Sequence, residues 1–372
     1  MTQQNWGGPP PSGQSFPAQA PVYGRQTFGQ LPAGVRPYPS QGFGQSVYGQ
    51  PAFGGGVPHY GPAPTMPGPP KRRSPLRLVV LALIGLAVIA LGALVVTGLD
   101  SVPTAQYQND DYEVPPPDLN PPPIPLPETY EQADNWVSSN ALYNQTTPVP
   151  VRCNSQPINV TTASDAQLKA HFEGLMECLM RVWQPPVTAA GWQIVRPSVT
   201  IYGEEITTKC GKSGINAFYC SADQQIYYSN QLPRVLESAS ENKWTADIVM
   251  AHEFAHALQG RTGILISAHA LGQNSGDKST DLQFTRRLET QADCFSGMFV
   301  RAVSSSLGVQ QQDSDGILAI YVAIGDDTLS GNPQVVGNHG LGVSRKYWGT
   351  TGLRTSAVGE CNTFVAPPNL VR

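Results

Sequence analysis

Residues 249–260 read VMAHEFAHALQG and contain the pattern H-E-x-x-H. On a helix, His252 and His256 lie one turn apart on the same face, so both imidazoles can bind one metal ion. Glu253 then lies beside the metal, where a carboxylate can take a proton from an attacking water molecule. The alternative is a buried helix that packs two histidines. We interpret the motif as a zinc-binding catalytic helix.

The flanking residues favour a helix from Trp244 to Leu258. This stretch contains neither proline nor glycine, and its apolar residues and histidines form one stripe at helical spacing. Gly260 and then Gly263 follow as stop signals. The sequence therefore predicts that the helix ends at Gly260.

Charge is distributed unevenly along the 372-residue chain. Residues 1–99 contain neither Asp nor Glu, and all 27 acidic residues lie from Asp100 onward. The boundary coincides with the apolar run LVVLALIGLAVIALGALVV (78–96), which would span roughly 28 Å as a helix. The basic stretch KRRSPLR directly precedes it, so the positive-inside rule keeps the N-terminal side cytoplasmic. We expect a single-span anchor with an extracytoplasmic C-terminal part. A cleaved signal peptide is the alternative, but it would lie nearer the start of the chain.

Composition divides the chain into four segments. Residues 1–70 are rich in proline and glycine, which predicts a disordered cytoplasmic tail that acts as a tether or in weak self-association. Residues 71–99 hold the basic flank and the single transmembrane helix. Residues 100–129 are acidic and proline-rich, so we expect a semi-rigid polyproline II stalk. Residues 130–372 have a globular composition and suffice for one core.

All six cysteines lie after the apolar run. An even number confined to the exported part predicts three disulfides in an oxidising compartment. Cys210 and Cys220 flank a short loop and form the favoured pair. A cysteine-based metal site is the alternative, but no C-x-x-C spacing is present. We expect the other two pairs to be Cys153 with Cys178 and Cys294 with Cys361.

The order of elements in the exported part is that of an α+β domain, with strands early and helices late. A capping box at Ser164 and Gln167 begins a helix that Pro185 and Pro186 are expected to end. His171 lies beside the apolar stripe of this helix and is interpreted as structural. Two strands and a later helix are expected near 194–203, 215–229 (a candidate hairpin) and 281–305.

A catalytic zinc usually has three protein ligands and one position for water. Downstream of His256, the candidates for the third ligand are His269 and Glu289. His269 does not fit, because H-E-x-x-H-x-x-G-x-x-H requires a histidine where this chain has Thr262. Glu289 fits better, because Asp293 follows four residues later on a predicted helix and can orient a ligand histidine. The alternative for both acids is a solvated helix face.

Several ordered motifs resemble one family. The stretches HEFAHALQG, ETQADCFSGMF, AIGDD and NHGLGVSRKYW, with CGKSGINAFYCSADQQIYYS before them, are similar to the bacterial membrane-anchored "putative neutral zinc metallopeptidases". The resemblance covers the chain from Cys153 onward, and it implies a zincin-like domain. It also implies that Glu289 is the third ligand and that Asp293 orients a histidine, His252.

The E-x-x-x-D pattern is also similar to thermolysin-like and neprilysin-like peptidases. The interval between His256 and Glu289 is longer here than in thermolysin, which indicates an insertion. His339 lies in the NHG loop of the last motif. A histidine that faces the metal would stabilise the oxyanion of a tetrahedral intermediate, and a structural loop histidine is the alternative.

These features predict a membrane-anchored peptidase of the cell envelope. Zn2+ would be bound by His252, His256 and Glu289, with Glu253 as the general base. Strand INAFYC or QQIYYS is expected to pair with an extended peptide. The expected partners are a peptide or protein substrate and the membrane, and no nucleic acid. The alternatives are a non-catalytic zinc-containing scaffold of the same fold, marked by a closed four-ligand site, and a cell-wall peptide amidase.

Overall fold

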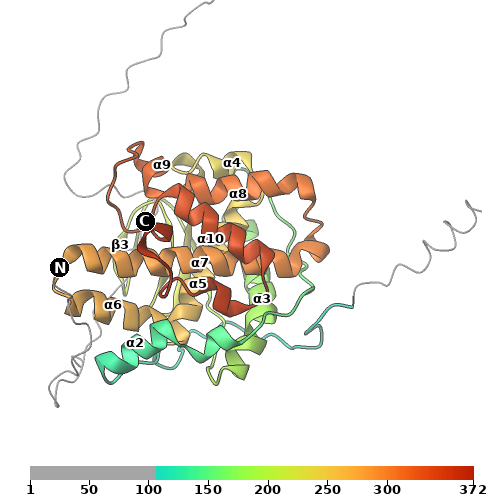
Figure 1. Cartoon of the computed structure of the whole chain (residues 1–372). Coiled ribbons are helices and arrows are strands. Elements are labelled where there is room, and N and C mark those ends of the chain that lie inside the picture. The colour runs from blue at the N-terminus through green and yellow to red at the C-terminus, as the bar shows by residue number, and fades with distance from the viewer. Residues whose placement is uncertain (1–105) are drawn as a thin grey trace, which may run out of the picture. The chain divides into compact units, whose positions relative to one another are not determined.

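The structure, a computed structural model, describes residues 106–372 (Figure 1). The predicted cytoplasmic tail, basic flank and membrane span lie outside the described residues. Between residues 106 and 372, no helix is both long enough and apolar enough to cross a bilayer. The described residues form an α+β domain, as the sequence predicts.

A three-stranded mixed sheet provides the β part of the domain. β5 (Gln225–Ser229) lies in the centre, parallel to β1 (Val199–Tyr202) and antiparallel to β4 (Ala217–Cys220). The hairpin expected within 215–229 is therefore confirmed, and β1 occupies only the end of the stretch 194–203. Because β5 is paired on both sides, β4 is an edge strand of this sheet.

A separate two-stranded hairpin precedes β4. It consists of β2 (Ile206–Thr208) and β3 (Gly211–Ser213), and the sequence does not predict it because these three-residue strands are short and mostly polar. The disulfide Cys210–Cys220 joins the turn of this hairpin to the end of β4. The favoured cysteine pair is thus confirmed.

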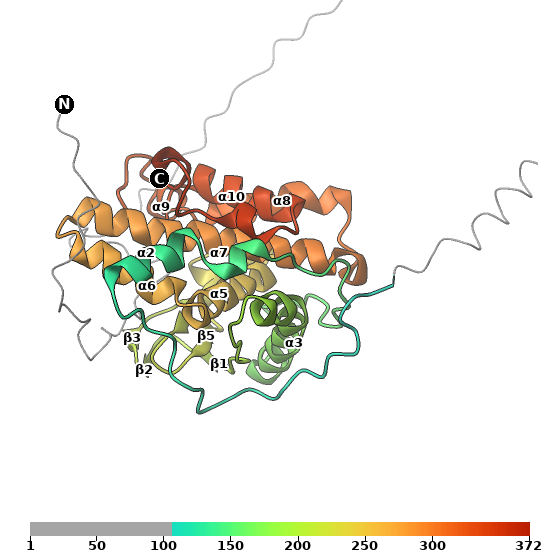
Figure 2. The same ribbon diagram turned by 60° about the horizontal axis from the view of Figure 1, so that its bottom comes forward.

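Helices form most of the domain. In chain order they are α2 (Tyr130–Ser138), α3 (Asp165–Ala189), α4 (Ser238–Glu241), α5 (Thr245–Arg261), α6 (Ile264–Asn274), α7 (Lys278–Leu307), α8 (Ser314–Ala323), α9 (Asp326–Ser330) and α10 (Gly342–Arg354). Every residue of α5 is buried, because α7 covers one side of it and the strands and α3 lie on the other (Figure 2). The sequence pattern predicts burial on one face of this helix, whereas the structure buries it on all sides.

The helix that begins at the Ser164–Gln167 capping box does not end at its two prolines. α3 continues through Pro185 and Pro186 to Ala189, so the predicted end is wrong. Pro185 has no N–H for the Arg181 carbonyl oxygen four residues earlier. That oxygen instead accepts a hydrogen bond of 2.6 Å from the side-chain amide of Asn109. A distant segment thus satisfies the acceptor that the proline leaves open.

The metal-motif helix also runs further than the sequence predicts. α5 passes through Gly260, and Gly263 directly after its C-terminal cap has a left-handed φ of 75°. A Cβ atom at Gly263 would overlap the indole ring of Trp136. The second glycine, rather than the first, therefore turns the chain, because both its conformation and its contact require the absence of a side chain.

α7 and α10 approach each other closely because glycines line their contact. A Cβ atom at Gly297 of α7 would lie 2.5 Å from the carbonyl oxygen of Gly349 on α10. A Cβ atom at Gly352 would overlap the backbone of Cys294. This contact places the buried side of α10 directly against the part of α7 that carries the predicted third ligand.

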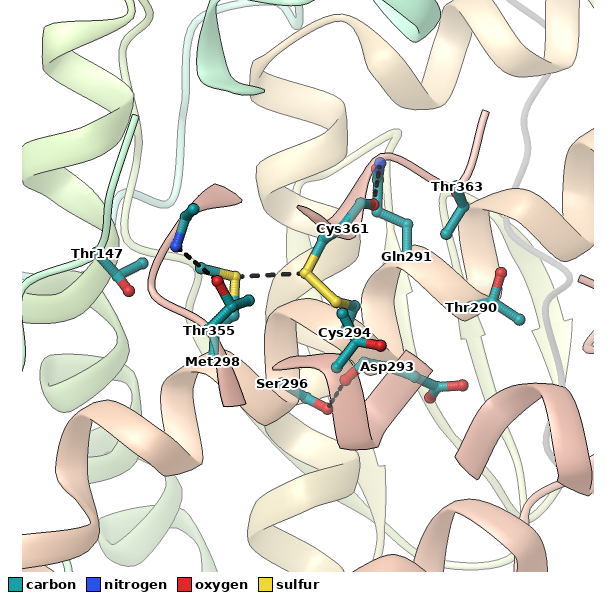
Figure 3. Close-up of a disulfide and its surroundings, with 12 residues drawn as sticks. Thr147, Thr290, Gln291, Asp293, Cys294, Ser296, Met298, Thr355, Cys361 and Thr363 are labelled. Carbon is teal, nitrogen blue, oxygen red and sulfur yellow. Dashed lines mark hydrogen bonds between the residues drawn. A yellow bond between two sulfur atoms is a disulfide. The ribbon is translucent and has the colours of Figure 1, made fainter. Parts of the chain in front are cut away.

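Two further disulfides, Cys153–Cys178 and Cys294–Cys361, complete the framework, and no described cysteine is free. All three predicted pairings are therefore confirmed. The Cys294–Cys361 bridge holds the C-terminal segment against α7, beside Asp293 (Figure 3). Gln291 on the same helix donates a hydrogen bond of 3.2 Å to the Cys361 carbonyl oxygen.

The proline-rich segment that precedes α2 lies against the domain instead of standing apart from it as a stalk. Figure 2 shows it as the teal coil that runs past the strands to α2. Arg261, at the end of α5, donates hydrogen bonds to the carbonyl oxygens of Pro122 and Pro123 at 3.0 and 3.3 Å. Arg196 donates to the Pro115 carbonyl oxygen at 3.2 Å. Proline residues lack a backbone N–H but retain a carbonyl oxygen, so arginine side chains can hold such a segment by hydrogen bonds to these oxygens.

Candidate metal centre

Two helices bring the three predicted zinc ligands together. His252 and His256 project from α5, and Glu289 projects from α7. The Nε2 atom of His252 lies 3.2 Å from His256 Nε2 and 3.2 Å from Glu289 Oε2, and His256 Nε2 lies 3.5 Å from Glu289 Oε1. Ligands bound tetrahedrally at ordinary zinc distances lie about 3.3 Å apart. The three side chains therefore fit a zinc ion as they stand.

Each ligand histidine is held by a hydrogen bond on its other ring nitrogen. His252 Nδ1 lies 2.9 Å from Asp293 Oδ1, which agrees with the expected role of Asp293. His256 Nδ1 lies 2.8 Å from Gln259 Oε1, and the Gln259 amide group donates in turn to the Leu288 carbonyl oxygen at 2.9 Å. These contacts point both Nε2 atoms at the centre and fix the tautomer that a metal requires.

Protonation states in the centre follow from burial and from neighbouring charges. Burial lowers the pKa of His256 to about 4, so this imidazole is neutral near pH 7. Burial also disfavours the charged form of Glu289, but the nearby His256 and a hydrogen bond from His252 outweigh it and hold that pKa well below its usual range. Burial opposes the charge on His252, while Asp293 and Glu289 favour it, and they raise its pKa to about 9. One proton on His252 must therefore leave when a metal binds.

Glu253 lies beside the ligands without joining them. Its side chain is buried, and one carboxylate oxygen accepts a hydrogen bond of 2.9 Å from the backbone N–H of Tyr219 on the edge strand β4. Burial raises the pKa of Glu253 to about 8, with the Glu289 charge adding to the shift and His252 opposing it. A bound cation would favour the carboxylate form. The residue is placed to exchange a proton close to neutral pH.

His339 is oriented by Asp326 at the start of α9. His339 Nδ1 lies 3.0 Å from Asp326 Oδ1, and the backbone N–H groups of His339 and Gly340 both donate to Asp326 Oδ2 at 2.9 Å. The next residue, Gly340, packs near Thr290, the neighbour of Glu289, since a Cβ atom at Gly340 would lie 3.7 Å from a Thr290 side-chain carbon. The loop of His339 therefore lies against the part of α7 that carries the predicted third ligand, and Asp326 orients its imidazole.

Arg345 of α10 lies behind the centre and is completely buried. It donates two hydrogen bonds of 2.8 Å to the two carboxylate oxygens of Asp293, and its Nη2 atom lies 3.9 Å from Glu289 Oε2. The centre therefore contains a buried guanidinium that compensates part of the negative charge of its carboxylates.

A family model described as "Putative neutral zinc metallopeptidase" matches residues 137–364, more than half of the chain. The chain belongs to this family. Uncharacterized protein Rv2575 of Mycobacterium tuberculosis is 28% identical to it over 206 residues, 50% of this chain and 67% of the relative. Uncharacterized protein YpfJ of Escherichia coli is 28% identical over 194 residues, 49% of this chain and 66% of the relative. No solved structure matches the chain significantly.

Besides His339, two histidines of the described residues lie outside the ligand set, His171 and His269. His269, on α6, is buried, and its pKa is lowered to about 4 by burial and by the nearby His256. His171 on α3 joins that helix to α5, with Nε2 2.6 Å from Asp247 Oδ1 and Nδ1 3.1 Å from Ser155 Oγ. The Ser155 hydroxyl also lies 2.9 Å from the His171 carbonyl oxygen, which accepts a hydrogen bond from it. These contacts tie α3 to its neighbours, and the structural role of His171 stays a prediction.

Three residues of the centre carry no role in the sequence interpretation. Gln259 lies three residues after His256, and Asp326 and Arg345 lie within the family motifs AIGDD and NHGLGVSRKYW. Helical spacing allows a contact between His256 and Gln259, so that pairing was within reach of sequence analysis. The contacts of Asp326 and Arg345 cross between helices that no local pattern relates.

Proposed function

We propose that the domain is a zinc-dependent peptidase that hydrolyses peptide bonds in extended chains. The observation that carries this proposal is the triangle of ligand atoms on His252, His256 and Glu289, with Glu253 directly beside it. A zinc ion held there with one open position would supply an activated water for hydrolysis. A zincin-like domain is the fold that we infer for this arrangement.

The chain's own residues would handle the protons. Glu253 would take the proton from the attacking water and pass it to the leaving amine. Burial raises its pKa to about 8 in the metal-free chain, and a nearby cation would lower that pKa. His339, held through Nδ1 by Asp326, directs Nε2 away from that carboxylate. From there it donates to the oxygen on which negative charge develops.

The edge strand β4 is the proposed site for an extended peptide. In the β4–β5 hairpin, backbone groups alternate between the partner strand and the outer edge. Tyr219 directs its N–H to the outer edge, where it meets Glu253, and Ala217 shares that edge by alternation. A peptide added along β4 would therefore pass the general base. Of the two strands considered from the sequence, β5 is excluded because it is paired on both sides.

The number of ligands favours an enzyme over a closed structural site. Within residues 106–372, the group of potential metal-binding side chains has three members, which leaves a tetrahedral ion one position for water. A non-catalytic scaffold would be expected to close that position with a fourth side chain.

We also propose that the domain lies on the extracytoplasmic side of a membrane, anchored by the apolar run 78–96. Three disulfides support an oxidising compartment. On intact cells, external protease should remove a tag at Arg372 and spare one at the N-terminus. The reverse pattern would contradict this topology.

Metal analysis of the purified full-length chain tests the centre. We expect close to one zinc per chain, and we expect Glu289→Ala to lose it because two histidines alone hold zinc weakly. Glu131→Ala, on the exposed side of α2, is the control and should keep the metal. Full zinc content in Glu289→Ala would contradict the assignment of the third ligand.

A further inference from the structure

Arg345 is a buried charge of the metal centre to which the peptidase chemistry gives no role. It lies on α10, is 0% exposed, and comes from a part of the chain 52 residues beyond its partner Asp293. A guanidinium is costly to remove from water unless its donors are paired, so its position requires a reason. Its contacts provide one.

The guanidinium holds both oxygens of the Asp293 carboxylate. Its Nε atom donates to Oδ2 and its Nη2 atom donates to Oδ1, each at 2.8 Å. This fork geometry fixes the plane of the carboxylate, which a single point charge does not. Asp293 Oδ1 also lies 2.9 Å from His252 Nδ1. The orientation of a metal ligand is therefore set by a carboxylate that is itself held in two places.

Arg345 is in turn fixed by the backbone. Its Nη1 atom donates to the Ile324 carbonyl oxygen at 2.8 Å, two residues before Asp326, the partner of His339. The close approach of α10 to this segment depends on glycine, because a Cβ atom at Gly325 would overlap the backbone of Gly342. The guanidinium thus joins α7, α10 and the segment that carries Asp326.

We propose that Arg345 is a positioning residue of the metal centre, which orients the ligand His252 by holding Asp293 in a two-point clamp. It touches neither the substrate nor the reacting atoms. Its Nη2 atom also lies 3.4 Å from His252 Nδ1 and 3.9 Å from Glu289 Oε2. A residue that keeps the positive charge but lacks the two-point clamp therefore separates the orientation of Asp293 from these direct contacts. This inference rests on the proposed metal centre, but not on peptide cleavage.

The test compares Arg345→Lys with the parent, using the full-length chain. Zinc affinity is measured by competition with a chelator, and the ligand geometry by the visible absorption of the Co2+-substituted chain. We expect Arg345→Lys to bind zinc about tenfold to a hundredfold more weakly, as for other residues that hold metal ligands, and to change the Co2+ spectrum. Affinity and spectrum equal to those of the parent would overturn the proposal.

Arg196→Lys is the matched control. Arg196 is also buried and also pairs with a carboxylate, at 2.9 Å from Glu173 Oε2, but its other partners are Glu177 and the Pro115 carbonyl oxygen and not residues of the metal centre. It should leave zinc affinity and the Co2+ spectrum unchanged. An equal loss of affinity in both variants would show a general effect of losing a buried arginine and would overturn the proposal.

A double-mutant cycle with Asp293→Asn tests whether Arg345 affects zinc affinity through Asp293. If Arg345 acts through Asp293, Arg345→Lys should change the zinc affinity of Asp293→Asn by less than about threefold. The same loss in both backgrounds would contradict the clamp.

If Arg345→Lys does not fold, Arg345→Gln, which retains two N–H donors, replaces it in the same cycle. A chain that binds zinc as expected but cleaves no peptide would contradict only the proposed function.

Discussion

The backbone N–H of Tyr219 donates a hydrogen bond of 2.9 Å to the carboxylate of Glu253. This contact joins the outer edge of β4 to the proposed general base, although the two residues lie 34 positions apart. A peptide that extends the sheet along this edge, as proposed, would lie next to the proton acceptor.

Backbone N-methylation of a cleaved peptide should therefore reduce cleavage at alternate positions. Strand pairing uses the N–H groups of every other residue, so each sensitive position should be followed by an insensitive one. We expect about tenfold or greater loss at each sensitive position, from one hydrogen bond and the steric effect of the methyl group. Mass spectrometry of a methyl-scanned peptide series measures this. Equal sensitivity at consecutive positions would contradict binding along β4.

Zinc affinity should rise with pH. His252 has a pKa raised to about 9 in the metal-free chain, so near neutral pH it carries a proton that zinc must displace. Below this pKa the apparent affinity should therefore increase about tenfold per pH unit, and above it the affinity should level off. Chelator competition between pH 6 and pH 9, corrected for protonation of the chelator, measures the slope. A flat profile would show that His252 is already neutral.

The motif on each ligand helix could be predicted from the sequence because each motif is local, whereas the meeting of the two helices at one site was implied by the family resemblance. The four-residue spacing of His252 and His256, and that of Glu289 and Asp293, each require only one helix. The clamp of Arg345 on Asp293 could not be predicted, because it depends on how closely α10 packs against α7. The packing glycines are visible in the sequence, but nothing local pairs them.

The two wrongly predicted helix ends also result from packing between distant segments, which the sequence does not show. Pro185 and Gly260 are correct local signals for an end, and both lie inside helices. Asn109 satisfies the carbonyl oxygen that Pro185 leaves open, and α5 is surrounded by packed elements at Gly260. Tertiary contacts therefore override the local preference, and only the contacts could have revealed it.

Removing the Cys294–Cys361 bridge should destabilise the domain without removing the metal ligands. The bridge closes a loop of 67 residues, and loop entropy predicts a loss of about 4 kcal/mol in the free energy of unfolding. Denaturant unfolding of the double Ser variant measures this loss.

Thiol titration of the unreduced parent is the control and should detect no free thiol. Two or more free thiols per chain would contradict the three-bridge framework.

Replacing two helical glycines by alanine should change the free energy of unfolding in opposite directions. One of them, Gly352, lies in the contact between α7 and α10, and the other does not. Gly352→Ala should destabilise the chain by about 1–3 kcal/mol, because the new methyl group overlaps the Cys294 backbone. Gly174→Ala on α3 is the matched control, since its Cβ would meet only the Ser155 side chain, at 3.4 Å. Helix propensity should stabilise that variant by up to about 1 kcal/mol. Equal effects of the two substitutions on the unfolding midpoint would contradict the close packing.

Cleavage by the zinc-loaded chain and its Glu253→Gln variant, across one broad peptide library, tests the central claim most directly. Glu253 is buried beside the ligands but is not one of them, so the variant should bind zinc as the parent does and melt within a few degrees of it. The amide cannot accept the proton from the attacking water, so cleavage should fall about a hundredfold to ten-thousandfold. Equal cleavage by parent and variant would contradict the role of Glu253. Absence of cleavage by the zinc-loaded parent would contradict the peptidase itself.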